Sequence, residues 1–308
     1  MSLFQKYKEP VFLKKDSDLE RQVAIITDAL PNYSESIQKV MREDIAILQY
    51  GLDGEKRIEY ELQNSHMPMY VLHDLYFEHN GLNAQIDFMI FTYKCVFVVE
   101  CKNLYGTINI DNKGEFTRSI YVSGRYRKEG IYSPITQNQR HLDLIRSMKI
   151  RTKFRAFMNA LTDDYFSRLF IPIVVIANDK TVLNDRYAKK DIKSKIIKSD
   201  QLISFMKETN RRSDVDVLTD KEMREGAESW LSHSVTKTAN YLGKYDKFDV
   251  TVLNDSITNQ SSETESILCP KCGAPMIKRV AKKGDNAGKA FYGCSRFPSC
   301  RGIVNVKE

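Results

Sequence analysis

Four cysteines near the C-terminal end of the chain have the spacing of a metal site. Cys269 and Cys272 lie in the stretch CPKCG, Cys294 and Cys300 lie in CSRFPSC, and twenty-one residues separate the two pairs. Two tight turns that each present two thiolates can bind one zinc ion tetrahedrally, and Gly273 permits the positive φ that such a turn needs. We therefore predict structural Zn2+ at these four cysteines. The alternatives are two disulfides, which a reducing cytosol disfavours, or four unrelated thiols.

The excess positive charge of the chain lies in the same segment. The formal net charge of the 308 residues is +7, and residues 269–308 hold nine basic residues against Asp285 and Glu308. Cations interleaved with aromatic rings are typical of proteins that bind single-stranded nucleic acid. The candidate nucleic-acid-binding residues are Arg279, Lys282, Lys283, Lys289, Phe291, Tyr292, Arg296, Phe297 and Arg301. The alternative is that Phe291 and Tyr292 form a minimal core while the charges face water or an acidic protein.

Asp87, Glu100 and Lys102 form a second candidate site. Residues two apart on a strand share a face, so Glu100 and Lys102 point the same way. A short turn at residues 93–95 would bring Asp87 to the same end of the paired strands. Two carboxylates can hold Mg2+ for phosphodiester hydrolysis, and a neighbouring lysine can position or deprotonate the attacking water. The alternative is a structural salt bridge between Asp87 and Lys102, with Glu100 in water.

The elements that must position these residues are strands flanked by helices. Helical periodicity covers residues 17–48 with a break near Pro31, a helical stretch opens at Gly54-Glu55, and another begins at Ser133-Pro134. Apolar runs predict strands at residues 69–77, 85–93, 96–106, 107–111 and 170–179. Further helices are expected at residues 200–207 and 220–233. This order predicts an α/β core with a largely antiparallel section.

Several side chains near the candidate site have open or ordinary interpretations. Gln137 and His141 lie one helical turn apart, off the apolar stripe, and face either a catalytic pocket or water. Cys95 and Cys101 are expected in the core, since neither has a visible partner base. The other histidines lack ligand-like spacing and are interpreted as ordinary residues: His66, His73, His79 and His233.

The cysteine segment resembles the C-terminal four-cysteine zinc finger of bacterial type I topoisomerases. The matching stretches are CPKCGAPMIKR at 269–279 and FYGCSRFPSCRG at 291–302. The resemblance implies contact with DNA, preferentially with single strands, and a ribbon held together by its metal. Because no topoisomerase catalytic body precedes it, strand passage is not implied.

The preceding residues resemble the nuclease-related domain (NERD) family, a branch of the PD-(D/E)xK superfamily. Four pieces match in order: Gly54-Glu55, Gln85–Asp87, Val99–Asn103 followed by Gly106, and Pro134–Gln137. The resemblance implies a restriction-endonuclease-like mixed sheet flanked by helices and a catalytic Mg2+ or Mn2+. It also implies roles for Asp87 and Glu100 as metal ligands, Lys102 as catalytic lysine, Glu55 as a helix-borne acid and Gln137 as a supporting residue. Ile86 stands where the superfamily name has proline.

The domain organisation expected from these segments has four parts. They are an N-terminal helical extension at residues 1–50, a nuclease domain at 51–243, a polar linker at 244–265 and a zinc ribbon at 266–308.

The motifs together predict a cytoplasmic, metal-dependent nuclease that acts on nucleic acid, with DNA as the expected substrate. No run of about eighteen apolar residues indicates a membrane span. The alternative is a catalytically silent nuclease fold that serves as a nucleic-acid-binding or protein-interaction adaptor. The sequence does not specify DNA against RNA, endo- against exonuclease cleavage, or the oligomeric state.

Overall fold

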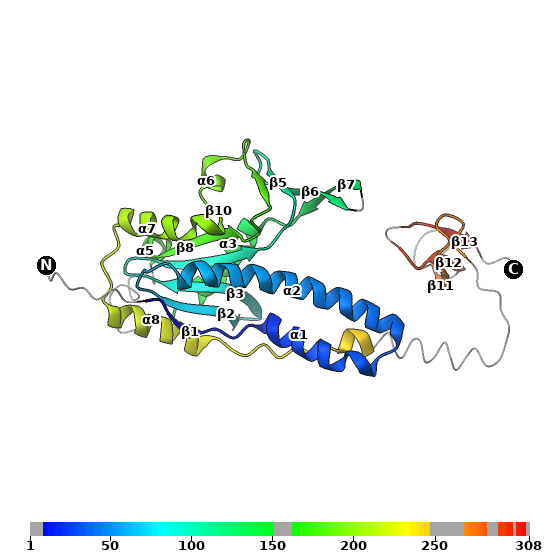
Figure 1. The fold of residues 1–308 in the computed structure, drawn as a ribbon, viewed down its shortest axis with the longest axis horizontal. Coiled ribbons are helices and arrows are strands. Elements are labelled where there is room, and N and C mark those ends of the chain that lie inside the picture. Colours follow the sequence, from blue (N-terminus) through cyan, green and yellow to red (C-terminus); the bar gives the residue numbers. More distant parts are fainter. Residues whose placement is uncertain are drawn as a thin grey trace. The chain divides into compact units, whose positions relative to one another are not determined.

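The computed structural model of the chain describes residues 9–122, 124–150, 162–246, 268–281, 289–297 and 300–305. The chain divides into two compact units, residues 1–246 and residues 247–308, and each is described by itself (Figure 1). Only the first three residues of the expected linker at 244–265 are among those described. Lys282 and Lys283 also lie outside the described residues.

A six-stranded mixed sheet forms the centre of the larger unit. Its strands, in spatial order, are β1 (Val11–Lys14), β2 (Tyr70–His79), β3 (Leu82–Phe91), β4 (Val96–Lys102), β8 (Phe170–Ile176) and β10 (Ile196–Lys198). β2, β3 and β4 are antiparallel neighbours, whereas β1/β2, β4/β8 and β8/β10 are parallel pairs. The α/β class is thereby confirmed, and the sheet contains the strands expected on both sides of the Tyr93–Cys95 turn.

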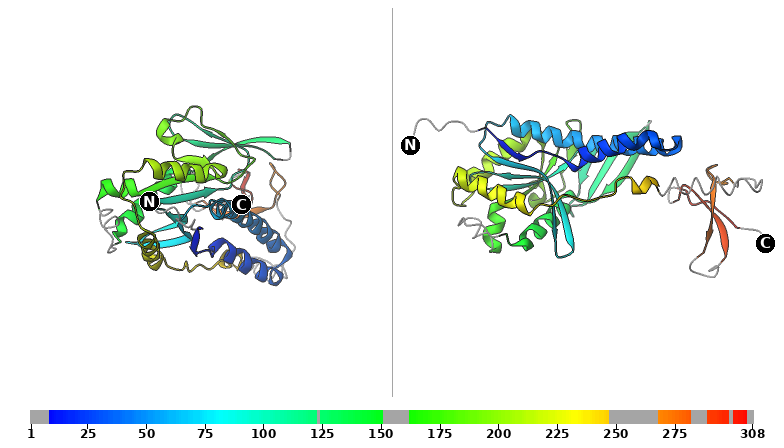
Figure 2. Two further views of the ribbon diagram at one scale, coloured as in Figure 1. Left: turned by 60° about the vertical axis from the view of Figure 1, so that its left-hand side comes forward. Right: turned by 90° about the horizontal axis from the view of Figure 1, so that it is seen from below.

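Helices cover both faces of this sheet (Figures 1 and 2). One face packs against α2 (Glu35–Gln63) and α7 (Leu202–Arg212), through side chains such as Ile58, Leu62 and Met206. The other face packs against α3 (Pro134–Met148), α5 (Asp163–Leu169) and α8 (Asp220–His233), where Trp230 is buried. Outside these layers, α1 (Asp18–Ala29) joins α2 through a 3-10 turn at Leu30–Asn32, and the short α6 spans Lys190–Lys193. Both layers together exclude water from the central strands.

The helix expected to open at Gly54-Glu55 begins much earlier, so that expectation was wrong. α2 runs unbroken from Glu35 to Gln63, and both residues lie in its interior, as does the expected boundary between residues 50 and 51. Buried apolar residues keep helical spacing through the glycines, and these are Ile37, Met41, Leu52, Ile58 and Leu62. Their burial outweighs the roughly 1 kcal/mol that each interior glycine costs. The N-terminal region also contributes β1 to the sheet, which periodicity did not predict.

A second sheet follows directly after β4 in the chain. Its strands, in spatial order, are β7 (Arg125–Ile131), β6 (Phe116–Val122), β5 (Thr107–Ile110) and β9 (Val182–Asn184). Ile108, Ile110 and Phe116 pack against Val174 and Ile176 of β8, which joins the two sheets. β5 matches the strand expected at residues 107–111, whereas neither strand of the β6–β7 hairpin was predicted.

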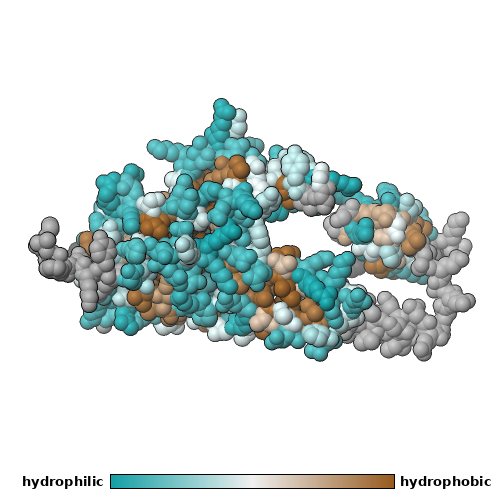
Figure 3. Space-filling model, viewed as in Figure 1, coloured by the Kyte–Doolittle hydropathy of each residue, from teal (hydrophilic) through white to brown (hydrophobic). Residues whose placement is uncertain are grey.

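The surface of the molecule is largely hydrophilic on the face drawn in Figure 3, with apolar residues gathered where α1 packs along α2. Among the described residues, no helix is long and apolar enough to cross a membrane.

Asn138 links α3 to the sheet and provides a test of this packing. Its buried side-chain amide donates hydrogen bonds to the Val98 carbonyl at 2.9 Å and the Ile173 carbonyl at 3.1 Å. Asn138→Leu removes both bonds and leaves buried carbonyls short of a donor. We expect it to lower the free energy of unfolding by about 2–3 kcal/mol. Urea unfolding measures the loss, and Gln139→Ala at the exposed next position is the control; equal losses in both variants would contradict the role.

Candidate functional site

The candidate site lies where β3 and β4 end their pairing. The ladder between them runs from Phe91 and Val96 to Phe88 and Val99. Beyond these residues the backbone pairing stops. The Cys101 amide instead donates a hydrogen bond to the side-chain Oδ2 of Asp87, at 2.6 Å. The expected convergence of Asp87 with the start of the Glu100-Cys101-Lys102 segment is therefore present in the structure.

Glu100, Lys102 and Gln137 are in direct contact. Lys102 Nζ donates to Glu100 Oε1 at 2.5 Å and to Gln137 Oε1 at 3.1 Å. Gln137 lies in the first turn of α3, whose N-cap Ser133 accepts a hydrogen bond from the Thr136 amide as expected. The Gln137 side chain therefore contacts Lys102 of the candidate site rather than facing only water. The alternative salt bridge between Asp87 and Lys102 does not form, since Lys102 pairs with Glu100 instead.

One oxygen of Glu100 has no hydrogen-bond donor within the described residues. Glu100 is 2% exposed, and its Oε2 is buried without a hydrogen-bond partner. His141 Nδ1 lies 3.5 Å from this oxygen. Burial, aided by the charge of Lys102, lowers the pKa of His141 to about 4, so the imidazole is neutral at neutral pH. A buried carboxylate oxygen that faces a neutral ring is an open acceptor for a cation.

The pKa values of the two acids and of the lysine are all raised, which favours neutral acids but a charged lysine. Burial raises the pKa of Asp87 well above its usual range, and repulsion from Glu100 and Glu55 adds to the shift. Burial also raises the pKa of Glu100, against the opposing effect of Lys102. For Lys102 burial acts to lower the pKa, but the charges of Glu100 and Asp87 prevail and raise it. The lysine is therefore held as a cation beside two carboxylates that ionise reluctantly.

Glu55 reaches the site from α2, which approaches β4 closely at Gly54. A Cβ on Gly54 would lie 2.6 Å from Asn103 Cβ and 3.3 Å from Cys101 Sγ, so only glycine fits without displacement. The buried Glu55 carboxylate is anchored by His73 Nε2 at 2.9 Å and by Ser17 Oγ at 3.1 Å. Gly54 thus allows α2 to approach β4 closely, and this approach places the neighbouring Glu55 carboxylate near the ends of the strands.

His73 is a site residue that the sequence reasoning missed. It is 4% exposed, its ring stacks on Phe88 with centroids 4.4 Å apart, and its Nδ1 lies 2.9 Å from the Lys15 carbonyl. Burial acts to lower the pKa of His73, but the hydrogen bond and the charge of Glu55 outweigh it and raise the pKa. A histidine within the apolar run MYVLHDLYF was a signal, since such a ring needs partners on both nitrogens.

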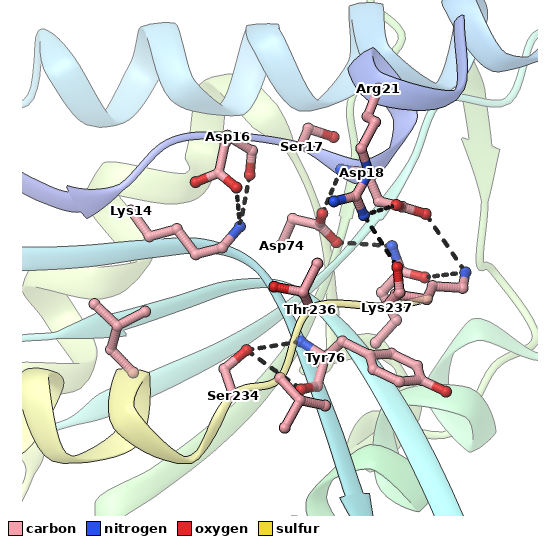
Figure 4. A pocket seen from close by; sticks show the side chains of 13 residues that line it. Lys14, Asp16, Ser17, Asp18, Arg21, Asp74, Tyr76, Ser234, Thr236 and Lys237 are labelled. Atoms are coloured by element: carbon pink, nitrogen blue, oxygen red, sulfur yellow. Dashed lines mark hydrogen bonds and ion pairs between the residues drawn. The ribbon is translucent and has the colours of Figure 1, made fainter. Parts of the chain in front are cut away.

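A separate polar cavity of about 300 Å³ lies beside this network (Figure 4). Asp74 accepts hydrogen bonds there from the Asp18 amide at 2.5 Å and from Gln85 Nε2 at 2.7 Å. Lys237 donates to Gln85 Oε1 at 3.1 Å and lies 3.6 Å from Asp18 Oδ2. The charged groups that line this cavity are therefore paired with one another.

The second unit brings its four cysteine sulfurs together. Within the described residues they form the only group of three or more His, Cys, Asp or Glu ligand atoms that lie within 4.8 Å of one another. Cys272 and Cys294 Sγ are 3.4 Å apart, and Cys269 and Cys300 Sγ are 3.8 Å apart. Tetrahedral zinc with Zn–S bonds of about 2.3 Å requires sulfurs about 3.8 Å apart. All six cysteines of the chain are free thiols, so the disulfide alternative does not hold.

Backbone geometry supports the same metal. Gly273 has φ +69°, as expected for the first turn, and its amide donates to the Cys269 carbonyl at 2.9 Å. A Cβ on Gly302 would collide with Cys269 Sγ, so glycine keeps the space beside the sulfurs open. The cysteine cluster therefore fits Zn2+.

The ribbon around the cysteines is a three-stranded antiparallel sheet of β11 (Met276–Val280), β12 (Ala290–Cys294) and β13 (Ile303–Asn305). Arg279 pairs with Phe291, and both lie over Gly293, on the face opposite to Tyr292 and Cys294. The small core consists of Cys269, Ala274 and Cys294 with Met276 and Cys300. Phe291 and Tyr292 are half-buried and outside that cluster. The remaining described candidates, Lys289, Arg296, Phe297 and Arg301, are exposed.

Comparison with known families agrees with both motif assignments. Residues 50–177 match the family model of the nuclease-related domain, NERD. Residues 266–308 match that of the topoisomerase DNA binding C4 zinc finger. The chain therefore combines a nuclease-related domain with a topoisomerase-type four-cysteine zinc finger, and the resemblances drawn from the motifs are confirmed.

Comparison with individual proteins covers a short segment. Over 57 residues the chain is 39% identical to DNA topoisomerase 1 of Mycoplasma genitalium, which amounts to 18% of this chain and 8% of that protein. The chain thus spans less than a tenth of the length of that relative. No solved structure matches the chain.

Zinc content tests the cysteine site. We expect the purified chain to carry one Zn2+, measured by inductively coupled plasma mass spectrometry, and Cys300→Ala to lose it, because three thiolates leave the tetrahedron open. Cys95→Ala, which removes a thiol outside the ribbon, should retain the metal. Zinc-free wild type or full retention in Cys300→Ala would refute the assignment.

The ion pair of Glu55 and His73 should make stability depend on pH. Because the folded-state pKa of His73 is raised, its contribution is fully present below the unfolded value of about 6.5 and is lost as the pH rises through the folded pKa. The free energy of unfolding of wild type minus that of His73→Gln should therefore fall as the pH rises above about 6.5 and through the raised folded-state pKa of His73. Urea titrations at each pH measure it. His66→Gln, at an exposed histidine, is the matched control; a flat difference for His73 would argue against the pair.

Proposed function

We propose that the chain is a metal-dependent nuclease that hydrolyses phosphodiester bonds in DNA, with a catalytic body at residues 51–243. The observation that carries this proposal is the convergence of Asp87, Glu100 and Lys102 where β3 and β4 separate, with Glu100 Oε2 left as an open acceptor. The match of residues 50–177 to the nuclease-related domain supports the same class of reaction. The cytoplasm is the compartment we expect.

Asp87 and Glu100 would hold Mg2+ or Mn2+. Carboxylate oxygens are the ligands that these hard cations prefer, and the two acids repel one another in the absence of a cation. When bound, the ion would polarise the phosphate and lower the pKa of a coordinated water.

The side chains around the carboxylates would orient and neutralise the substrate. Lys102 has a raised pKa, so its ammonium stabilises negative charge on the phosphate rather than removing a proton from water. Gln137 accepts a hydrogen bond from Lys102 and fixes its direction. Glu55, anchored by His73, keeps a further negative charge near Asp87 and so favours a cation there.

The zinc ribbon would supply affinity for DNA. Its exposed cations, including Arg296 and Arg301, are the groups that neutralise phosphates, and Phe297 is 59% exposed for contact with bases. The polar linker expected at residues 244–265 would connect the DNA-binding ribbon to the catalytic body. We also propose that the ribbon prefers single-stranded DNA.

A cleavage assay with defined metals tests the catalytic assignment. We expect Mg2+- or Mn2+-dependent cleavage of DNA by wild type. Loss of one oxygen ligand in Glu100→Gln, or of the ammonium in Lys102→Ala, should slow cleavage by about a hundredfold or more. Binding to labelled DNA should persist, since the ribbon is unchanged.

Matched substitutions on α8 provide the controls. Glu228→Gln and Lys221→Ala make the same chemical changes at surface ion pairs and should leave cleavage unchanged. Cleavage that survives in Glu100→Gln would exclude the site, and DNA binding without any cleavage by wild type would favour the silent adaptor.

A further inference from the structure

The β6–β7 hairpin is a local concentration of positive charge on a balanced body. Residues 116–131 contain four basic residues and one acid. Arg118 forms an ion pair with Glu129 across the hairpin. Within the described residues, Arg125, Arg127 and Lys128 make no ion pair, and all three are exposed. Three unpaired cations on one projecting ribbon are a footprint for a polyanion.

Two exposed tyrosines accompany these cations at the end of the hairpin. Tyr121 and Tyr126 are directly opposite one another and are 73% and 56% exposed. Their ring centroids are 5.5 Å apart at an interplanar angle of 61°, and the Tyr126 hydroxyl donates to Ser119 Oγ at 3.0 Å. The rings are thus held in place without being buried. Strand alternation places Lys128 on the same face, two residues from Tyr126.

The hairpin is attached to the two segments that carry the site. Its sheet begins at Thr107, five residues after Lys102, and β7 ends at Ile131, six residues before Gln137. Leu104 and Ile135, which adjoin Lys102 and Gln137, pack with Phe116 and Ile131 in one apolar cluster. Figures 1 and 2 show β6 and β7 projecting beyond the end of the main sheet.

Gly106 fixes the base of this hairpin. Its φ is +106°, and a Cβ there would collide with the Ile120 side chain and the Ser119 carbonyl, so β6 rests directly on the chain that leaves β4. The close approach joins the hairpin rigidly to the Lys102 segment.

We propose that the β6–β7 hairpin binds a single-stranded segment of the substrate DNA beside the cleavage site. Tyr121 and Tyr126 stack on unpaired bases, and Lys128 on the same face contacts an adjoining phosphate, while Arg125 and Arg127 on the opposite face add to the positive potential of the hairpin. The choice of DNA rests on the proposed function. The choice of a single strand rests on the exposed rings, because base faces are accessible for stacking only where the bases are unpaired.

Binding in a cleavage-deficient background tests the hairpin independently of catalysis. The full-length Glu100→Gln chain is titrated against a fluorescent thymidine oligonucleotide and against a duplex of equal length. Adding Tyr121→Ala and Tyr126→Ala should weaken single-strand binding roughly tenfold or more and duplex binding much less. Tyr60→Ala with Tyr187→Ala, at tyrosines 64% and 69% exposed elsewhere on the body, should change neither affinity.

The salt dependence and a crosslink add two further readouts. Lys128→Ala should reduce the slope of log Kd against log salt by about 0.7, since each phosphate contact on a single strand contributes about 0.7. An oligonucleotide with 5-iodouracil should crosslink to Tyr121 or Tyr126, identified by mass spectrometry.

The outcomes separate this inference from the proposed function. Unchanged single-strand affinity and slope in folded hairpin variants overturn the inference even where wild type cleaves DNA. Equal losses on duplex and single strand overturn the single-strand assignment. Weakened single-strand binding together with the crosslink supports the hairpin even where wild type cleaves nothing, and in that case the nuclease proposal alone fails.

Discussion

The constraint on which the larger unit depends is the presence of one buried and one half-buried carboxylate at the end of an apolar sheet. The strands that carry Asp87 and Glu100 are otherwise built from buried apolar residues such as Phe88 and Val99. An uncompensated buried charge costs several kcal/mol, so the surroundings must supply donors and cations. The Cys101 amide serves Asp87, Lys102 serves one oxygen of Glu100, and the second oxygen is left open. The position of α3 follows from this need, because Gln137 must reach Lys102.

A second consequence is that the N-terminal segment belongs to the body. Ser17 at the start of α1 donates to Glu55, and the Lys15 carbonyl contacts His73. Gly54 lets α2 come close enough to β4 for Glu55 to act on Asp87. The segment between β1 and α1 therefore holds in place a carboxylate that lies about forty residues further along the chain. A helical extension that merely preceded the domain would make no such contacts.

Sequence patterns correctly predicted those contacts that form between residues close together in the chain. Strand alternation was sufficient to place Glu100 and Lys102 together, and cysteine spacing was sufficient for the metal cluster. The start of α2 was missed because the glycines were interpreted as a boundary, whereas tertiary packing carries the helix through them. His73 and Ser17 were missed because their partner Glu55 is distant in sequence. The β6–β7 hairpin has mixed polarity on both faces, so it lacks the alternation that marks a half-buried strand.

The net charge of the larger unit does not show where on its surface an anion is attracted or repelled. Residues 1–268 are balanced, yet three carboxylates lie near β4, and three cations without an ion pair among the described residues lie on the β6–β7 hairpin. Because charges are screened over about 10 Å at moderate salt, each group sets the potential only in its own surroundings.

Carboxylates alone would repel a phosphate backbone, so the proposed nuclease site requires cations both within it and along the path to it. Lys102 is the cation within the site, and the hairpin lies in the chain between Lys102 and Gln137. The zinc ribbon carries the overall excess, of which four thiolates and one Zn2+ offset about two charges. If the chain is the nuclease proposed above, this distribution of positive charge would bring an anionic substrate to an acidic site.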